Sequence, residues 1–246
     1  MRKEVHILNG DALRAQFPKA ISGQIYVCRE CLVDGNVEGE DLDQLFKNRA
    51  SFLSKNYGGT VEDYFDYVVS EFRAILAIEN STINLWFEDD LFCQVNLWFV
   101  SFLLHKSNKG NQVYLIRPRE HTAYGFGGLD ESELISIYEN RKHLAELDRI
   151  ADLWNMYQRN ATDQMLEIAK QLEESLPFVA PAVQAHIDRI PANGNLGRPI
   201  ETLKAIMEEL NTEDFGLIFR EFSRREPIYG FGDLQVKRLY EQLLRQ

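Results

Sequence analysis

Four short apolar segments, each followed at once by charged or amide side chains, constrain the fold of this chain more than any other feature. The segments are EVHIL at 4–8, QIYVC at 24–28, INLWF at 83–87 and QVYLI at 112–116. Longer stretches in which apolar residues recur at helical spacing separate them. Strands that are apolar almost throughout and alternate with helices are typical of a parallel sheet covered on both faces. The sequence therefore predicts an α/β fold, Rossmann-like, with a mostly parallel sheet of about four or five strands.

The second half of the chain has a different pattern. From Asp130 onward apolar residues recur at helical spacing, and we expect helices near 162–175, 178–190, 199–210, 213–224 and 233–244. The sequence thus predicts a Rossmann-like domain at 1–122 and a predominantly helical domain at 123–246. The helical domain is expected to resemble a winged-helix bundle at its end, with Ile228 and Tyr229 in a short wing strand.

One motif occurs twice. YGFGGL at 124–129 recurs as YGFGDL at 229–234, each time just before an expected helix. Glycine permits backbone conformations that other residues avoid. We interpret the repeat as two similar loop-to-helix junctions rather than as a duplicated domain.

Charge and composition argue against several classes of protein. The 246 residues carry a formal net charge of −11, which disfavours non-specific nucleic-acid binding because such binding depends on Lys and Arg neutralising phosphates. The longest apolar run, 91–104, is interrupted by polar residues and is too short to cross a membrane. Three cysteines, an odd number, do not build a disulfide framework. We expect a soluble cytoplasmic protein with a small-molecule ligand, and the sequence leaves its oligomeric state open.

Polar side chains follow all four predicted strands. They are Asn9, Gly10 and Asp11 after the first strand, Arg29 and Glu30 after the second, Glu88, Asp89 and Asp90 after the third, and Arg117 and Arg119 after the fourth. Ligands of open α/β sheets bind beyond the carboxyl ends of the strands. If the strands are parallel, these residues meet at one edge of the sheet and form a ligand site.

The residue types limit the chemistry of such a site. Clustered carboxylates hold a hard cation such as Mg²⁺, and arginine binds phosphate with a planar fork. Asp11, Glu30, Glu88 and Asp90 are therefore candidates for catalytic acid–base or metal-binding groups, and Arg29, Arg49 and Arg117 for anion binding. The alternative for 88–90 is helix capping, with Asp89 or Asp90 as the cap.

Two further residues have both a functional and a structural interpretation. Arg49 lies on the apolar face of an expected helix, where it would bind an anion or form a salt bridge that orients a catalytic acid, or would pack its stem and send its head to solvent. Gln94 lies one turn after Asp90 and faces the same way. It would bind the ligand or satisfy a buried backbone group.

Several motifs together resemble a bacterial family catalogued as domain of unknown function eighteen thirty-five. They are HILNGDAL (6–13), RECLVDGNV (29–37), NRASFL (48–53), LWFEDDLFCQVNL (85–97), FGGLDESEL (126–134), LPFVAPAVQAHIDRIP (176–191) and YGFGDL (229–234). The resemblance covers most of the chain. It implies no activity and no catalytic residue, only motif positions.

Two classes of function follow from these patterns. The leading hypothesis is a transferase or hydrolase that acts on a phosphate-containing small molecule such as a nucleotide, with a divalent metal, for instance Mg²⁺, as its cofactor. The alternative is a non-catalytic ligand-sensing or regulatory module whose helical domain binds a partner or DNA. An interaction protein without a ligand is a third option.

Overall fold

A five-stranded sheet forms the centre of the protein, in the order β2-β1-β3-β4-β5. The computed structural model describes all residues except 1, 108, 120–121, 123, 193 and 246. The strands are β1 (Lys3–Leu8), β2 (Gln24–Val27), β3 (Ser81–Trp86), β4 (Gln112–Ile116) and β5 (Lys142–His143). The first four are parallel, and β5 pairs antiparallel with β4. The predicted α/β fold with a mostly parallel sheet is confirmed.

Side-chain alternation along the strands divides the apolar residues between two cores. Ile7 and Leu85 enter the larger core on one face of the sheet, whereas Leu8 and Trp86 enter a smaller core on the other. Both faces are buried, so almost every strand position is apolar. His6, also fully buried, accepts a hydrogen bond at Nδ1 from the Trp86 indole nitrogen at 3.2 Å.

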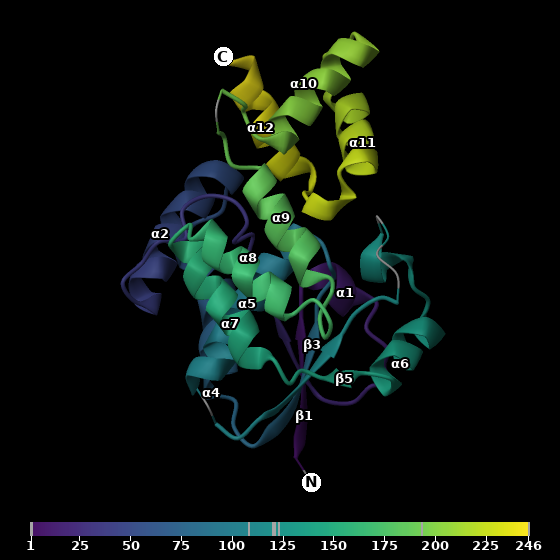
Figure 1. Cartoon of the computed structure of the whole chain (residues 1–246). Helices are drawn as coiled ribbons and strands as arrows, with labels where there is room; N and C mark the ends of the chain where they lie inside the picture. The colour runs from purple at the N-terminus through teal and green to yellow at the C-terminus, as the bar shows by residue number, and fades with distance from the viewer. Residues whose placement is uncertain (1, 108, 120–121, 123, 193, 246) are drawn as a thin grey trace.

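Helices cover both faces of the sheet. The helices near the sheet are α1 (Asp11–Ala15), α2 (Leu42–Tyr57), α3 (Val61–Tyr64), α4 (Ser70–Ala77), α5 (Leu91–Ser107), α6 (Glu131–Glu139) and α7 (Leu147–Gln158), with the π-helical turn η1 (Phe65–Val69) between α3 and α4 and the 3-10 turn η2 (Gly125–Gly128) before α6. In Figure 1, α6 stands on one side of the sheet, and α4, α5 and α7 stand on the other. Since α7 packs along α5, the helical region is joined closely to the sheet.

The rest of the chain is helical. Its elements are α8 (Thr162–Gln171), α9 (Val179–Asp188), α10 (Arg198–Leu210), α11 (Phe215–Arg225), the 3-10 turn η3 (Pro227–Tyr229) and α12 (Asp233–Leu244). Residues 197–245, with α10, α11, η3 and α12, form a lobe at the top of Figure 1 that we call the C-terminal lobe. Ile228 and Tyr229 lie in η3, so the expected wing strand is wrong. The Pro227 ring removes a backbone donor and favours a turn there.

The sheet also continues past the predicted boundary at residue 122, because β5 pairs with β4.

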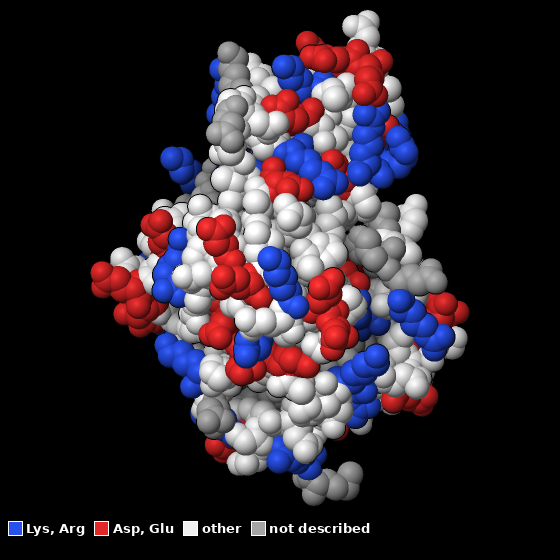
Figure 2. Space-filling view, viewed as in Figure 1, with Lys and Arg blue, Asp and Glu red and all other residues white. Residues whose placement is uncertain are grey.

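Among the described residues, no helix is both long and apolar enough to cross a membrane. On the face shown in Figure 2, Lys and Arg side chains are mixed with Asp and Glu side chains.

Candidate functional site

The strand order places a topological switch point between β1 and β3. The chain moves from β1 to β2 in one direction along the sheet and to β3 in the other, so β1 and β3 are neighbours whose following loops diverge. Ligands of doubly wound sheets bind at such a switch point. Asn9 follows β1 and Glu88 follows β3. Both therefore lie where the topology favours a ligand.

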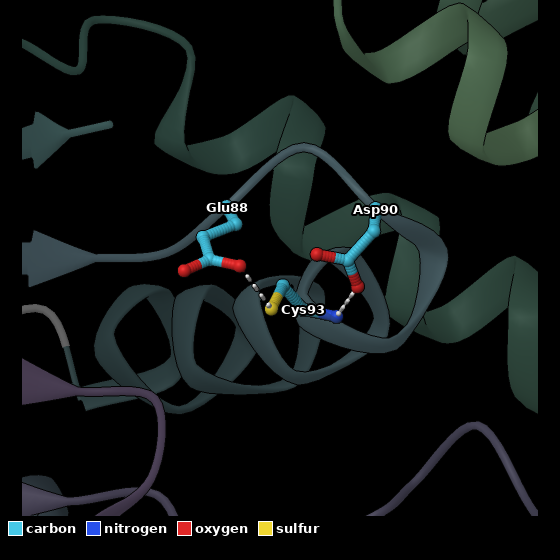
Figure 3. A group of neighbouring side chains, drawn as sticks. All are labelled: Glu88, Asp90 and Cys93. Atoms are coloured by element: carbon cyan, nitrogen blue, oxygen red, sulfur yellow. Dashed lines mark hydrogen bonds between the residues drawn. The ribbon is translucent and has the colours of Figure 1, made fainter. Parts of the chain in front are cut away.

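Three side chains come together at the end of β3 (Figure 3). The possible ligand atoms of Glu88, Asp90 and Cys93 lie within 4.8 Å of one another. We call these residues the acidic cluster. Asp90 Oδ1 accepts a hydrogen bond from the Cys93 backbone N–H at 2.9 Å, and Cys93 Sγ lies 3.9 Å from Glu88 Oε2. The expectation that Asp89 or Asp90 caps the helix is confirmed, and the cap is Asp90.

The surroundings of Glu88 favour its protonated form. Burial, together with repulsion from Asp90 and Asp89, raises the pKa of Glu88 to about 7. The hydrogen bond that the Glu88 carboxylate accepts from the Phe126 N–H lowers this pKa, but by less than burial raises it. That bond is 2.7 Å long. Burial, followed by repulsion from Asp90 and Glu88, also raises the pKa of Cys93 well above its ordinary value. A carboxyl group with a pKa near neutrality is suited to donate and accept protons.

The repeated YGFG motif closes over the acidic cluster. A Cβ added to Gly125 would collide with the Glu88 carboxyl group, and one added to Gly230 would collide with the Asp90 carboxyl group. Both glycines have positive φ, 50° and 62°. The two loop-to-helix junctions thus place a glycine against each acid, a convergence that the sequence repeat alone did not indicate.

Glu30 and Arg49 form a fully buried ion pair away from the acidic cluster. Arg49 Nε and one terminal nitrogen donate to the two Glu30 oxygens at 2.9 and 2.8 Å, and both side chains have an exposed fraction of 0%. Tyr64 Oη also donates to Glu30, at 2.7 Å. Arg49 further donates to the backbone oxygens of Asp34 and Cys31. The pair therefore ties the segment after β2 to α2. Arg49 forms a salt bridge, and the alternative that its head reaches solvent is wrong because the guanidinium is fully buried against Glu30.

The other two candidate arginines are also paired. Arg29 holds Asp11 through two bonds of 2.7 and 2.9 Å and reaches Glu71 at 3.1 Å. Arg117 pairs with Asp89 and stacks 3.8 Å above the Phe178 ring. Each of these charges is balanced within the chain.

An amide network connects the ends of β1, β2 and β3. Asn96 Nδ2 donates to Asn9 Oδ1 at 2.8 Å and to the Glu30 backbone oxygen at 2.7 Å. Asn9 Nδ2 donates to Cys93 Sγ at 2.9 Å. Gln94 Nε2 donates to the Glu88 backbone oxygen at 2.7 Å, which is the structural interpretation of that residue. Its buried Oε1 has no hydrogen-bond partner among the described residues.

Asn96 was not among the residues selected from the sequence. It lies in a helix that is buried on nearly all sides, and its polarity within that apolar segment was the only available signal. Gly10, which was selected, lies just before α1 with φ 100°, and a Cβ added to it would meet no atom within 4 Å. It permits the turn from β1 into α1.

Comparisons with known proteins give no relative from which to transfer a function. No family model matches the chain, and neither the curated proteins nor the solved structures contain a match. The resemblance to the bacterial family stays a prediction.

The acidic cluster is the set of described residues best placed to hold a cation. Two carboxylates supply oxygen ligands of the kind that Mg²⁺ and Mn²⁺ prefer, and a thiol would add affinity for a softer metal such as Zn²⁺ once deprotonated. Glu88 could instead move a proton. Cation binding and proton transfer are therefore the two chemistries that this arrangement supports.

Proposed function

We propose that the protein is an enzyme that acts on a phosphate-containing small molecule through a divalent cation held by the acidic cluster. The observation that carries the proposal is the convergence of Glu88, Asp90 and Cys93 within 4.8 Å at the carboxyl end of β3. That end adjoins the switch point of the sheet, where doubly wound proteins bind ligands. The proposed class includes both transfer and hydrolysis.

The paired arginines determine how a phosphate would be held. Arg29, Arg49 and Arg117 are each bound to a carboxylate, so a phosphate would have to displace a carboxylate to reach them. A cation bound by Glu88 and Asp90 would supply positive charge without such a displacement, because substrate phosphates commonly complete the shell of Mg²⁺. In this proposal the cation binds the phosphate, and the arginines keep the strand ends in place.

Glu88 would have a second role. Cation binding would favour its carboxylate form and release a proton near neutral pH, since its pKa is raised to about 7 by burial. Cation binding is therefore expected to strengthen as pH rises from 6 to 8. The Gly125 and Gly230 loops cover the two acids, so a substrate would reach the cation only after one of the loops moves.

The test uses Mn²⁺ as the probe and Asp90→Asn as the variant. Asn caps a helix about as well as Asp, so Asp90→Asn removes the charge and keeps the acceptor for the Cys93 N–H. The matched control is Asp214→Asn, because Asp214 caps α11 by accepting from the Leu217 N–H. Equilibrium dialysis is expected to give binding of Mn²⁺ to the wild type and the control, and at least tenfold weaker binding to Asp90→Asn.

The phosphate part of the proposal is tested separately. A thermal-shift screen with nucleotides and sugar nucleotides is expected to raise the melting temperature of the wild type with Mn²⁺ present and not in its absence, because a ligand that binds only the native state stabilises it. Equal binding of Mn²⁺ to wild type and Asp90→Asn would overturn the cation site. Cation binding without any phosphate-dependent shift would overturn the substrate class alone.

A further inference from the structure

A pocket lies at the junction between the C-terminal lobe and the rest of the chain, and its lining contains no residue of the acidic cluster. Its volume is about 300 Å³. Known small-molecule sites measure about 300 to 1,000 Å³ and often lie at domain junctions. The pocket lining comes from the segment after β2, from the end of α9 and the turn that follows, and from α10 and α12 with the loop before it. A ligand here would contact all of these parts at once.

The walls of this pocket are largely apolar. Val33 and Ile190 line it from the body of the protein, and Pro199, Phe231 and Leu239 line it from the C-terminal lobe. Phe231 and Leu239 are partly exposed although they pack against the core. An apolar ligand body would remove them from water, which favours binding.

Arg189 gives the pocket its charge. Its three nitrogens donate to neutral acceptors, namely His186 Nδ1, the Val33 backbone oxygen and Tyr157 Oη. Among the described residues Arg189 makes no ion pair, unlike Arg29, Arg49 and Arg117. Its guanidinium is therefore held in place by hydrogen bonds while its charge is left unbalanced beside an apolar cavity. An anion is the ligand group that such a position favours.

The other charges at the pocket do not cancel that of Arg189. Asp34 is already bound to Arg238 at 2.8 Å and accepts a hydrogen bond from Tyr57 Oη. His186 is buried, and its pKa is lowered to about 3 by burial and then by Arg189, so the ring is neutral. Asp34 and Arg238 offset each other, and Arg189 leaves the pocket with a net positive charge.

We propose that this pocket binds a small carboxylate with an apolar body, with the carboxylate on Arg189 and the apolar body against Phe231 and Leu239. The inference is independent of the proposed cation site. Such a ligand would bind at the junction of the C-terminal lobe, where a ligand-sensing module would bind its effector.

The test uses 2-naphthoate as the probe and 2-naphthamide as its neutral counterpart, both measured by isothermal titration calorimetry. The wild type is expected to bind the carboxylate with 1:1 stoichiometry and at least about tenfold more tightly than the amide, which corresponds to about 1.4 kcal/mol. Arg189→Met is expected to remove the preference for the carboxylate. Arg245→Met is the control, because Arg245 is exposed on the same lobe and pairs only with Glu241 among the described residues.

A second variant keeps the test decisive if Arg189→Met does not fold. Leu239→Trp fills the cavity and leaves Arg189 in place, and it is expected to weaken both probes at least tenfold, with circular dichroism confirming the fold. Absence of binding to the wild type, equal affinity for both probes, or undiminished binding in Leu239→Trp would each overturn the proposal.

Discussion

Gly230, in the loop before α12, lies directly against the carboxyl group of Asp90, which caps α5 at the end of β3. Gly125 lies in the same way against Glu88. Two copies of one short motif, one before α6 and one before α12, thus close over two acids of one turn. A side chain at either glycine would push the loop away from the acid beneath it, so the absence of a side chain is what permits the closure.

This relationship predicts a coupling between Gly230 and Asp90. Gly230→Ala is expected to lower the free energy of unfolding by about 2 to 4 kcal/mol, because a left-handed backbone costs a non-glycine residue about 1 to 2 kcal/mol and overpacking adds a similar amount. An Asp90→Ala background removes the two closest contacts, those with the carboxyl atoms, and leaves only Asp90 Cβ at 3.0 Å, so the same substitution should cost mainly the backbone part. Urea denaturation of the four proteins in this cycle measures the difference. Equal costs in the two backgrounds would mean that Gly230 and Asp90 are independent.

The sequence predicted the sheet because the physics that forms it is local. Residues such as Ile7 and Leu85 alternate with residues that are buried on the opposite face, and both faces need apolar side chains. The cap at Asp90 was also predictable, since it depends on residues one turn apart. By contrast, β5 has only two residues, and both are exposed. It therefore has no hydrophobic pattern from which a strand could be predicted.

The partners of the site residues were not predictable in the same way. Arg49 pairs with Glu30 and Arg117 with Asp89 across different elements, and the sequence offers several carboxylates for each arginine. The contact of Gly230 with Asp90 depends on how the C-terminal lobe packs against the sheet. Tertiary packing determines which residues pair, and a single sequence shows only which residues are present.

The raised pKa of Glu88 predicts a specific dependence of stability on pH. Its pKa is about 7 in the folded protein, against an ordinary value of 4.5. Between these values the unfolded chain releases the proton first, so the native state binds more protons and stability falls as pH rises, levelling off above pH 7. Glu88→Gln keeps a neutral acceptor for the Phe126 N–H and removes the titration.

The measurement is the difference in unfolding free energy between wild type and Glu88→Gln at several pH values. From pH 5 to pH 8 the wild type is expected to lose on the order of 2 to 3 kcal/mol relative to the variant. A difference that stays constant across this range would show that the Glu88 carboxyl group titrates with an ordinary pKa.

The Glu30–Arg49 pair predicts a large loss of stability when one partner is removed. Arg49→Met leaves the Glu30 carboxylate buried without its counter-charge, which costs about 3 to 5 kcal/mol. Arg73→Met is the control, because Arg73 pairs with Asp43 at the surface and such pairs contribute about 0 to 1 kcal/mol. Adding Glu30→Met to Arg49→Met should recover part of the loss, as urea denaturation would show. If Arg49→Met were no more harmful than Arg73→Met, the pair would not be structural.

The thiol of Cys93 leads to a prediction about which metal the acidic cluster prefers. A thiolate is a strong ligand for Zn²⁺ and a poor one for Mn²⁺, which is held mainly by oxygen ligands. Because the pKa of Cys93 is raised by burial and by the nearby acids, Zn²⁺ can use the sulfur only by displacing its proton. Cys93→Ser is therefore expected to weaken Zn²⁺ binding at least tenfold and to change Mn²⁺ binding less than threefold, as measured by equilibrium dialysis.

Zn²⁺ binding to the wild type should release one more proton than binding to Cys93→Ser, which calorimetry in buffers of different ionisation enthalpy would detect. Equal Zn²⁺ affinities and equal proton release would show that the sulfur takes no part and that the cluster is an oxygen site.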